Sequence, residues 1–483
     1  MHLVCVGGSD AGISAALRAR ELDPLCEVTV VVADAYPNFS ICGIPYYVSG
    51  EVAHWRNLAH RTAADLEATG MRLMLDTLVT KIDVEGHSLH VRRSDGSESA
   101  LSYDRLVVGT GAVPVRPPIA GVDGRGGLGE LDGVHLLHTM GDTFSLVRAL
   151  ESGPAERVLI VGAGYVGLEM ADGLTVRGLR VEQVEMLEEV LPTVDPALGA
   201  LVRVELVSRN VDVTTSTTVR RIALADAGAG GRLLVEGESA DGSAYRRATD
   251  LVLVSVGVRP ETGLLVAAGA KTGARGAVVV DEEMRTGLPD VFAAGDCVVT
   301  HHRLLGPTYL PLGTTAHKQG RVAGENALGG RARFAGSLGT QVVKVFDLVA
   351  ARTGLRHHEA LQAGFVPATT ESAPDDHKAY YPTAHPITAR VTGDIETGLL
   401  LGAQLVGRRG TEVAKRIDTF AAAIYAAMSV EQMAELDLSY TPPLGSPWDA
   451  VQMAAEAWVR EHQLEARRRE LHGRLAAEDP AGP

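Results

Sequence analysis

The 483-residue chain has few aromatic side chains and no surplus of positive charge. Aromatic residues make up 4% of the sequence, so we expect cores of valine, leucine and alanine, as α/β proteins have. The formal net charge of −15 argues against nucleic acid and anionic membrane surfaces as partners, because their phosphates would repel the chain.

Long apolar segments and targeting signals are missing as well. No apolar stretch approaches the ~18 residues that are needed to span a bilayer. The sequence enters a predicted strand at residues 3–6 without the basic stretch that opens a signal peptide. We therefore expect a cytoplasmic protein with no membrane partner.

The four cysteines include no CxxC pair, which argues against a metal site and against a redox-active dithiol within one motif. Cys5 lies in an apolar predicted strand and Cys26 directly before another, so both are expected to be buried structural thiols. Cys297 follows the predicted strand 290–296, a position that also favours packing. Cys42 differs from these three, because it lies in a turn-rich stretch.

Two glycine-rich turns, each between a predicted strand and a predicted helix, carry most of the functional information. In the second turn, GAGYVG at 162–167, Gly162 permits a tight turn, Gly164 lets the backbone approach a pyrophosphate, and Gly167 lets the helix pack on the strand. The N–H groups at the helix start, including that of Tyr165, would bind the phosphates.

An acid closes the predicted strand that follows this turn. The carboxylate of Glu185 would accept hydrogen bonds from the hydroxyls of a ribose. No arginine follows it to receive a 2′-phosphate, so NADH is expected in preference to NADPH. Gly257, in the buried strand and turn at 251–260, is a further candidate for cofactor binding.

The first turn is less regular and comprises Gly7, Gly8, Ser9, Asp10, Ala11 and Gly12. Ser9 replaces the middle glycine, but it is small enough for a pyrophosphate to approach. Val32 stands where an acid is expected, and Asp34 would replace that acid if the loop is shifted. From this turn alone, a Rossmann-like unit that binds no nucleotide is a fair alternative.

Two downstream stretches favour a nucleotide. Thr110 with Gly111, and Gly295 with Asp296, end buried strands at one edge of a parallel sheet, where open α/β folds bind their ligands. Asp296 would accept hydrogen bonds from the ribityl chain of a flavin.

A helix follows these stretches. Thr314 and Thr315 lead into it, and it is predicted to begin near Ala316. Its positive end, aimed at the flavin pyrimidine, would stabilise an anionic reduced ring by ~1 kcal/mol.

Four segments together resemble a known family. They are FSICGIPYY at 39–47, AGDC at 294–297, LGTTAHKQGRVAG at 312–324 and SYTPPLGSPWD at 439–449. They are similar to the single-cysteine branch of the flavin pyridine-nucleotide disulfide oxidoreductases, which includes coenzyme A disulfide reductases, NADH oxidases and NADH peroxidases. The resemblance implies FAD, NADH on the opposite flavin face, a homodimer and Cys42 as the non-flavin redox centre.

The fold class expected from the patterns and the resemblance is α/β, with two Rossmann-like dinucleotide-binding domains plus a C-terminal α+β dimerisation domain. The predicted parts are an FAD-binding domain at 1–112 and 253–328, an NAD(H)-binding domain at 113–252, a dimerisation domain at 329–457 and a charged tail at 458–483.

The resemblance also assigns roles to single residues. Glu169 matches an acid that lies near the nicotinamide in the family. Tyr380 or Tyr381, and Tyr440, match tyrosines that the partner subunit of coenzyme A disulfide reductases places beside the cysteine, where a phenol would bond the thiolate or protonate the leaving thiol. The alternative is that these tyrosines are merely exposed at a dimer surface.

The environment expected for Cys42 is one that activates a thiol. A flavin and a helix N-terminus nearby would lower the pKa of the thiol. Because no second cysteine is close in sequence, the oxidised form is expected to be a mixed disulfide or a sulfenic acid. Cys297 would also lie near the flavin, although its position at a strand end favours packing.

The sequence departs from the family pattern at two positions. Asp10 stands where members that handle peroxide or oxygen carry a histidine, so a base beside a sulfenic acid is missing. Ile41 replaces an asparagine of coenzyme A disulfide reductases, which leaves the substrate thiol open. Arg18, Arg20 and Arg61 would meet the phosphates of coenzyme A, unless they are solvated surface residues.

The favoured hypothesis is that electrons pass from NADH through FAD to a mixed disulfide on Cys42. The expected substrate is coenzyme A disulfide or a related small disulfide or persulfide. Three alternatives remain open: an NAD(P)H oxidase that reduces oxygen, a flavin reductase that serves a protein acceptor, and a redox sensor with negligible turnover.

Overall fold

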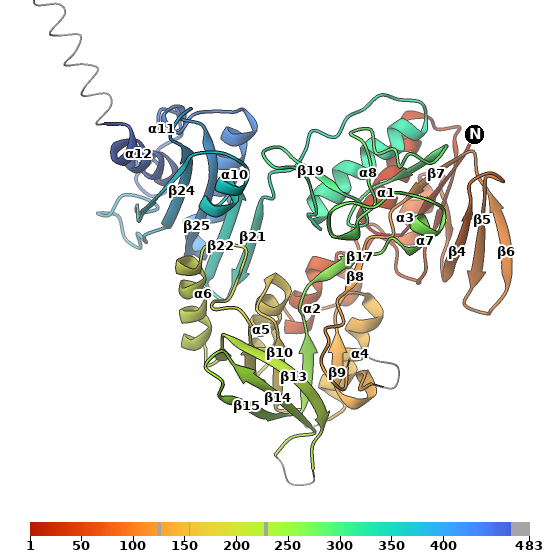
Figure 1. Ribbon diagram of the computed structural model, residues 1–483, viewed down its shortest axis with the longest axis horizontal. Helices are drawn as coiled ribbons and strands as arrows, with labels where there is room; N and C mark the ends of the chain where they lie inside the picture. The colour runs from red at the N-terminus through yellow and green to blue at the C-terminus, as the bar shows by residue number, and fades with distance from the viewer. Residues whose placement is uncertain (123–126, 154, 227–229, 465–483) are drawn as a thin grey trace, which may run out of the picture. The chain divides into compact units, whose positions relative to one another are not determined.

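The computed structural model describes residues 1–122, 127–153, 155–226 and 230–464 (Figure 1). These residues form two compact units. The larger unit holds Met1–Leu187 with Asn210–Ser337, and the smaller holds Glu188–Arg209 with the residues from Leu338 onward.

The first sheet of the larger unit is fully parallel and has the order β18-β7-β1-β2-β3. Its strands are β1 (His2–Val6), β2 (Glu27–Val31), β3 (Arg72–Met74), β7 (Arg105–Val108) and β18 (Val291–Ala293). Because β18 comes from far along the chain, two separate stretches of sequence build this sheet, as predicted.

Two helices, α1 (Asp10–Leu22) and α8 (Gly313–Ala327), pack closely together beside this sheet (Figure 1). A Cβ atom at Gly320 would lie 2.3 Å from the carbonyl oxygen of Ala11, so only glycine permits this approach. The buried alanines of α1 and valines of β2 fill the core beneath, as the low aromatic content predicts.

The second sheet of the larger unit repeats this plan with the order β12-β11-β10-β16-β9, again all parallel. Its strands are β9 (Val134–Leu136), β10 (Arg157–Val161), β11 (Arg180–Val184), β12 (Asp212–Thr214) and β16 (Leu251–Val254). Helix α5 (Tyr165–Val176) follows the central strand β10. The prediction of two Rossmann-like units is therefore confirmed.

Antiparallel meanders and short elements complete the larger unit. The meanders are β4 (Thr77–Asp83), β5 (Ser88–Arg93) and β6 (Glu98–Ser102), and β13 (Thr217–Leu224), β14 (Leu233–Ser239) and β15 (Ala244–Thr249). The ribbons are β8 (Ala112–Pro114) with β17 (Val258–Pro260), and β19 (Thr300–His302) with β20 (Gly306–Thr308). The remaining helices are α2 (Ile44–Ser49), α3 (Ala63–Ala68), α4 (Met140–Glu151) and α7 (Gly263–Ala267).

The smaller unit is an α+β domain, as predicted. Its antiparallel sheet has the order β21-β22-β25-β24-β23. The strands are β21 (Gln341–Val345), β22 (Leu348–Gly354), β23 (Pro367–Ser372), β24 (Thr388–Asp394) and β25 (Leu400–Arg408). The helices are α6 (Pro196–Ser208), α9 (His357–Gln362), α10 (Val413–Tyr425), α11 (Val430–Ala434) and α12 (Ala450–His462).

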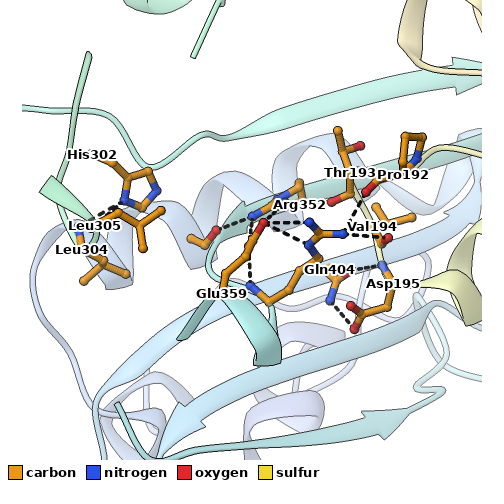
Figure 2. A network of polar contacts seen from close by, with 12 residues as sticks. Pro192, Thr193, Val194, Asp195, His302, Leu304, Leu305, Arg352, Glu359 and Gln404 are labelled. Carbon is orange, nitrogen blue, oxygen red and sulfur yellow. Dashed lines mark hydrogen bonds and ion pairs between the residues drawn. The ribbon is translucent and has the colours of Figure 1, made fainter. Parts of the chain in front are cut away.

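A polar network fixes the segment before α6 within the smaller unit (Figure 2). Arg352 donates to the carbonyl oxygen of Thr193 at 2.8 Å and to both carboxylate oxygens of Glu359, at 3.2 and 2.7 Å. Gln404 receives the N–H of Asp195 at 2.7 Å and donates to its carboxylate at 2.8 Å. These bonds explain why α6 groups with the C-terminal sheet.

Several boundaries differ from those expected. The predicted boundary at 253 cuts through β16, whose strand partners all lie in the second sheet, and α6 lies in the smaller unit instead of the predicted NAD(H)-binding domain. The expected start of α8 near Ala316 is wrong by about one turn, because the extended backbone ends at Leu312. Residues 465–483 of the predicted tail lie outside the described residues.

Candidate active site

The first glycine turn is held in place by backbone contacts that leave no room for side chains. Gly7 has φ +113°, and a Cβ atom there would lie 2.1 Å from the carbonyl oxygen of Gly109. A Cβ atom at Gly12 would lie 2.1 Å from the carbonyl oxygen of Gly7. Ser9 precedes α1, is exposed, and its hydroxyl makes no capping bond to the helix. The exposed Ser9 thus lies at the start of α1, where a helix N-terminus suits a phosphate.

A cavity of about 630 Å³ extends from this turn along the carboxyl ends of the first sheet. It brings together most of the residues that the sequence predicts for FAD. They are Gly7, Gly8, Ser9, Asp10, Asp34, Thr110, Gly111 and Asp296, and Cys42 lies in the same wall.

The other predicted FAD ligands, Ala11, Gly12, Gly295, Thr314 and Thr315, do not line this cavity. Gly295 packs behind it, because a Cβ atom there would lie 2.8 Å from that of Ala11. Thr315 is buried, and its hydroxyl lies 3.3 Å from that of Ser337. Gly313, at the start of α8, lines the cavity in their place.

Two carboxylates in the cavity wall have raised pKa values. Burial raises the pKa of Asp296 to about 6, and the charge of Asp10 adds to this effect. Burial also raises the pKa of Asp34, whose carboxylate accepts the N–H of Tyr36 at 2.8 Å. Acids that lose solvation in an open cavity are suited to accept bonds from the hydroxyls of a ligand.

These observations agree with FAD as the occupant. The turn at 7–12 fits a pyrophosphate, Asp34 is placed for a ribose, and Asp296 for a ribityl chain. Sequence analysis missed Glu261, another member of the wall, whose carbonyl oxygen accepts the Thr110 hydroxyl at 2.6 Å. Because that hydroxyl donates its hydrogen to Glu261, it would meet the cofactor as an acceptor.

Cys42 is set apart from the other cysteines by its exposure. It lies in the 3-10 turn Ile41–Gly43, directly before α2, and is exposed in the cavity wall. Cys5, Cys26 and Cys297 are buried, with at most 1% of their surface accessible. The expectation that these three thiols are buried is confirmed.

The expectation of a lowered pKa for Cys42 is wrong for the protein part of the site. Loss of solvation in the concave wall raises the pKa of this thiol, and the charges of Glu169, Asp10 and Asp296 raise it further. The carboxylates that suit a cofactor thus oppose a thiolate.

The second glycine turn repeats the close packing of the first. Gly162 has φ +103°, and a Cβ atom at Gly167 would lie 2.3 Å from its carbonyl oxygen. A Cβ atom at Gly164 would meet no atom within 4 Å, so the space before the turn is open. Helix α5 begins at Tyr165, directly behind that space. Gly257 also has open space around its α-carbon, with φ +100°.

Glu185 follows β11 and is only 7% exposed. Its carboxylate accepts the N–H of Ala163 at 2.7 Å and that of Leu187 at 3.0 Å. Each carboxylate oxygen can accept two bonds, so acceptance from a ribose remains compatible with this geometry. Its role in the structure is to fix the glycine turn, which sequence analysis did not foresee.

A tyrosine joins the Cys42 segment to the second Rossmann unit. The hydroxyl of Tyr46, in α2, lies 3.1 Å from the carboxylate of Glu169, in α5. Burial and this carboxylate raise the pKa of Tyr46. Glu169 is therefore near Cys42 and on the helix that follows the second turn, which is where the resemblance places an acid beside the nicotinamide.

The predicted tyrosines of the dimerisation domain lie at the surface of the smaller unit. Tyr381 is 42% exposed and Tyr440 is 44% exposed. The ring of Tyr381 packs edge-on against that of His377 at 5.7 Å, and the hydrogen bond that the Tyr380 hydroxyl donates to Tyr440 raises the pKa of Tyr380. Their placement beside Cys42 of a partner subunit stays a prediction.

Two of the three arginines considered for coenzyme A phosphates are engaged elsewhere. Arg18 forms ion pairs with Glu21 at 2.9 Å and Glu325 at 2.6 Å, and Arg20 donates to the carbonyl oxygens of Thr69 and Cys26. Only Arg61 is exposed without such bonds in the described residues.

The search for membrane spans and metal clusters covers the described residues. Within them, no helix has the length and apolar character to cross a bilayer. No group of three or more potential ligands is placed to hold a metal ion in the same residues.

Comparisons with known proteins agree with this geometry. Residues 1–320 match the family model of pyridine nucleotide-disulphide oxidoreductases, and residues 340–451 match the model of that family's dimerisation domain. The chain is 33% identical to an NADH oxidase of Methanocaldococcus jannaschii, over 94% of its own length and 98% of the relative's. It is also 33% identical to an NAD(P)H sulfur oxidoreductase (CoA-dependent) of Pyrococcus furiosus, over 92% and 96%. The solved structure of an NAD-dependent persulfide reductase from A. fulgidus aligns with a TM-score of 0.88 at 36% identity, covering 95% of this chain and 83% of that one.

Proposed function

Because the chain belongs to the pyridine nucleotide-disulphide oxidoreductases, which bind FAD and NAD(P)H, we propose that it reduces a small-molecule disulfide or persulfide at Cys42. The observation that carries this proposal is the place of Cys42, exposed in the wall of the cavity that fits FAD, while the other cysteines are buried. A substrate sulfur can reach Cys42, and no internal thiol can.

The net reaction is NAD(P)H + H⁺ + RSSR → NAD(P)⁺ + 2 RSH. When bound, FAD supplies the two-electron transfer between the nicotinamide and the disulfide. Cys42 holds one half of the substrate as a mixed disulfide, and the S–S bond breaks to leave the Cys42 thiolate and a released thiol. The Cys42 thiolate then attacks the next disulfide.

The binding residues follow from the two turns. For FAD we assign the turn at 7–12, Asp34, Thr110 with Gly111, and Asp296. For NADH we assign the turn at 162–167 with Tyr165, Glu169, Glu185 and Gly257. Glu185 and the absence of an arginine directly after it favour NADH, because a buried carboxylate repels a 2′-phosphate.

The substrate class rests on two relatives, one named for CoA-dependent sulfur reduction and one for persulfide reduction. Coenzyme A disulfide and a coenzyme A persulfide are therefore the first compounds to test. The cytoplasm is the compartment we propose, because it supplies NADH and keeps thiols reduced.

We also propose a homodimer formed through the C-terminal domain. The family's dimerisation model covers residues 340–451, and the smaller unit exposes Tyr380, Tyr381, Tyr440, Leu444 and Trp448. Exposed apolar groups of this size are typical of a surface that a partner covers. In the dimer, Tyr381 and Tyr440 would complete the partner's site.

The test is Cys42→Ser, assayed by NADH oxidation with coenzyme A disulfide under nitrogen. We expect the disulfide-dependent rate to fall at least about 100-fold, because serine forms no mixed disulfide. Cys26→Ser is the matched control, since Cys26 is buried away from the cavity and should leave the rate unchanged.

Oxygen reduction is the competing function, and the name of the M. jannaschii relative favours measuring it. An oxidase would consume oxygen and NADH at full rate without any disulfide. If Cys42→Ser oxidises NADH with coenzyme A disulfide as fast as the wild type does, the proposal is contradicted.

A further inference from the structure

Asp10 lies at the first position of α1 and in the wall of the cavity that contains Cys42. The structure provides an imidazole from another element. His317, in α8, places its Nε2 atom 3.2 Å from the Asp10 carboxylate.

The second ring nitrogen of His317 is also bonded. Its Nδ1 atom lies 2.9 Å from the hydroxyl oxygen of Ser14, one turn further along α1. A protonated imidazole donates from both nitrogens, and here each donor faces an oxygen that can accept. The geometry therefore suits an imidazolium, and the hydrogen bond to Asp10 raises the pKa of His317.

The charge of Asp10 acts on Cys42. Its carboxylate is one of three that oppose the Cys42 thiolate, with Glu169 from α5 and Asp296 from the turn after β18. A protonated His317 offsets the charge of Asp10, and a neutral His317 leaves that charge uncompensated. Arg61 and His60 also face His317, the latter with a ring separation of 6.3 Å.

We propose that Asp10 and His317 form a carboxylate–imidazolium pair that favours the thiolate of Cys42 by cancelling the Asp10 charge in the cavity wall. His317 does not line the cavity, so it acts through Asp10 as a positioning residue. The inference rests on the proposed function, because it takes Cys42 to be the reactive thiol.

The test measures how fast iodoacetamide labels Cys42 in the reduced holoprotein, by mass spectrometry, from about pH 5 to about pH 9. The variants are His317→Gln, Asp10→Asn and the double variant. His87→Gln is the matched control, because His87 forms the same kind of pair with Asp290, at 3.1 Å, but neither residue lines the cavity.

If the charge of Asp10 controls the thiolate, the two single variants should differ in their effect on the labelling rate. His317→Gln leaves Asp10 uncompensated and slows labelling at neutral pH by about 3- to 10-fold, because the pKa of the thiol rises and less thiolate is present. Asp10→Asn does not slow it. In the Asp10→Asn background His317 lacks the bond that raises its pKa and is mostly neutral at neutral pH, so His317→Gln has little further effect there. The inflection from His317 in the pH profile is absent from His317→Gln and lies at lower pH in Asp10→Asn.

Two results would overturn the inference: equal labelling of His317→Gln and wild type, or the same slowing by His317→Gln in the Asp10→Asn background, which indicates a merely structural role. Both differ from failure of the proposed function, which the rate of Cys42→Ser with coenzyme A disulfide reports independently of labelling. His87→Gln should label like wild type throughout.

Discussion

Replacing Asp296 by asparagine should stabilise the flavin-free protein and weaken its affinity for FAD. Burial raises the pKa of Asp296 to about 6, against an ordinary value of 3.8. The native state therefore binds a proton more tightly than the unfolded state does. Between about pH 4 and pH 6 only the native state keeps this proton, so the free energy of unfolding falls as the pH rises through this window.

The size of the effect follows from the shift. One pKa unit corresponds to about 1.4 kcal/mol, so the ionised carboxylate costs the empty protein about 2–3 kcal/mol above pH 6. Asparagine keeps the shape without the charge. The variant should gain about that much stability at pH 8 and almost nothing at pH 4. FAD should bind at least about tenfold more weakly, because a neutral amide makes weaker bonds to hydroxyl donors than a carboxylate does.

The assay is urea unfolding of the flavin-free protein at both pH values, with a fluorescence titration of FAD. Asp241→Asn is the control, because a hydrogen bond from Ser243 lowers the pKa of that exposed carboxylate and no stabilisation is expected. A flavin-free Asp296→Asn protein that unfolds at lower urea than wild type at pH 8 would refute the reasoning, since the ionised carboxylate would then be net favourable.

The two glycines of the second turn should separate binding from folding. Gly167→Ala places a Cβ atom 2.3 Å from the Gly162 carbonyl oxygen and should lower the melting temperature. Gly164→Ala meets no atom within 4 Å and should raise only the KM for NADH, by about tenfold. Equal melting temperatures of the two variants would contradict this prediction. In the smaller unit, burial of Glu359 acts to raise the pKa of its carboxylate, but bonds from Arg352 and Arg356 outweigh this effect and lower that pKa to about 2. Its charge therefore stabilises the fold above about pH 4.5, and this contribution is lost as the pH falls toward 2. Glu359→Gln should cost about 2–4 kcal/mol at pH 7 in urea unfolding, while Glu371→Gln, 53% exposed and 3.6 Å from Arg390, should cost less than about 1 kcal/mol.

The fold was predictable from sequence where the signals are local. Both strand–turn–helix units carry glycines that their own backbone contacts require, and the alternation of buried and exposed residues distinguishes the meanders from the parallel sheets. The boundary at 253 and the grouping of α6 were not predictable in this way. Each depends on pairing between distant segments, such as the bonds of Gln404 to Asp195.

Parts of the site were hidden from sequence for the same reason. The Asp10–His317 contact joins residues far apart in the chain, and nothing local to HKQG marks its histidine as a partner of an acid. Tyr46 could have been noticed, because it lies within the Cys42 segment, 39–47, that the resemblance quotes. The engagement of Arg18 was also visible, since Glu21 lies three positions further on the same helix.

The charges around Cys42 explain how one wall can serve two chemical needs. Asp296 is half-buried, and loss of solvation raises its pKa and that of Asp34, so both carboxylates gain from hydroxyl donors, which suits a sugar-containing cofactor. The charges of Glu169, Asp10 and Asp296 make a thiolate costly, so reactivity at Cys42 requires a compensating positive group. Among the described residues that pair with these three acids, His317 is a cation whose charge depends on pH near neutrality. The proton that His317 holds thus decides how much of the Asp10 charge reaches the sulfur.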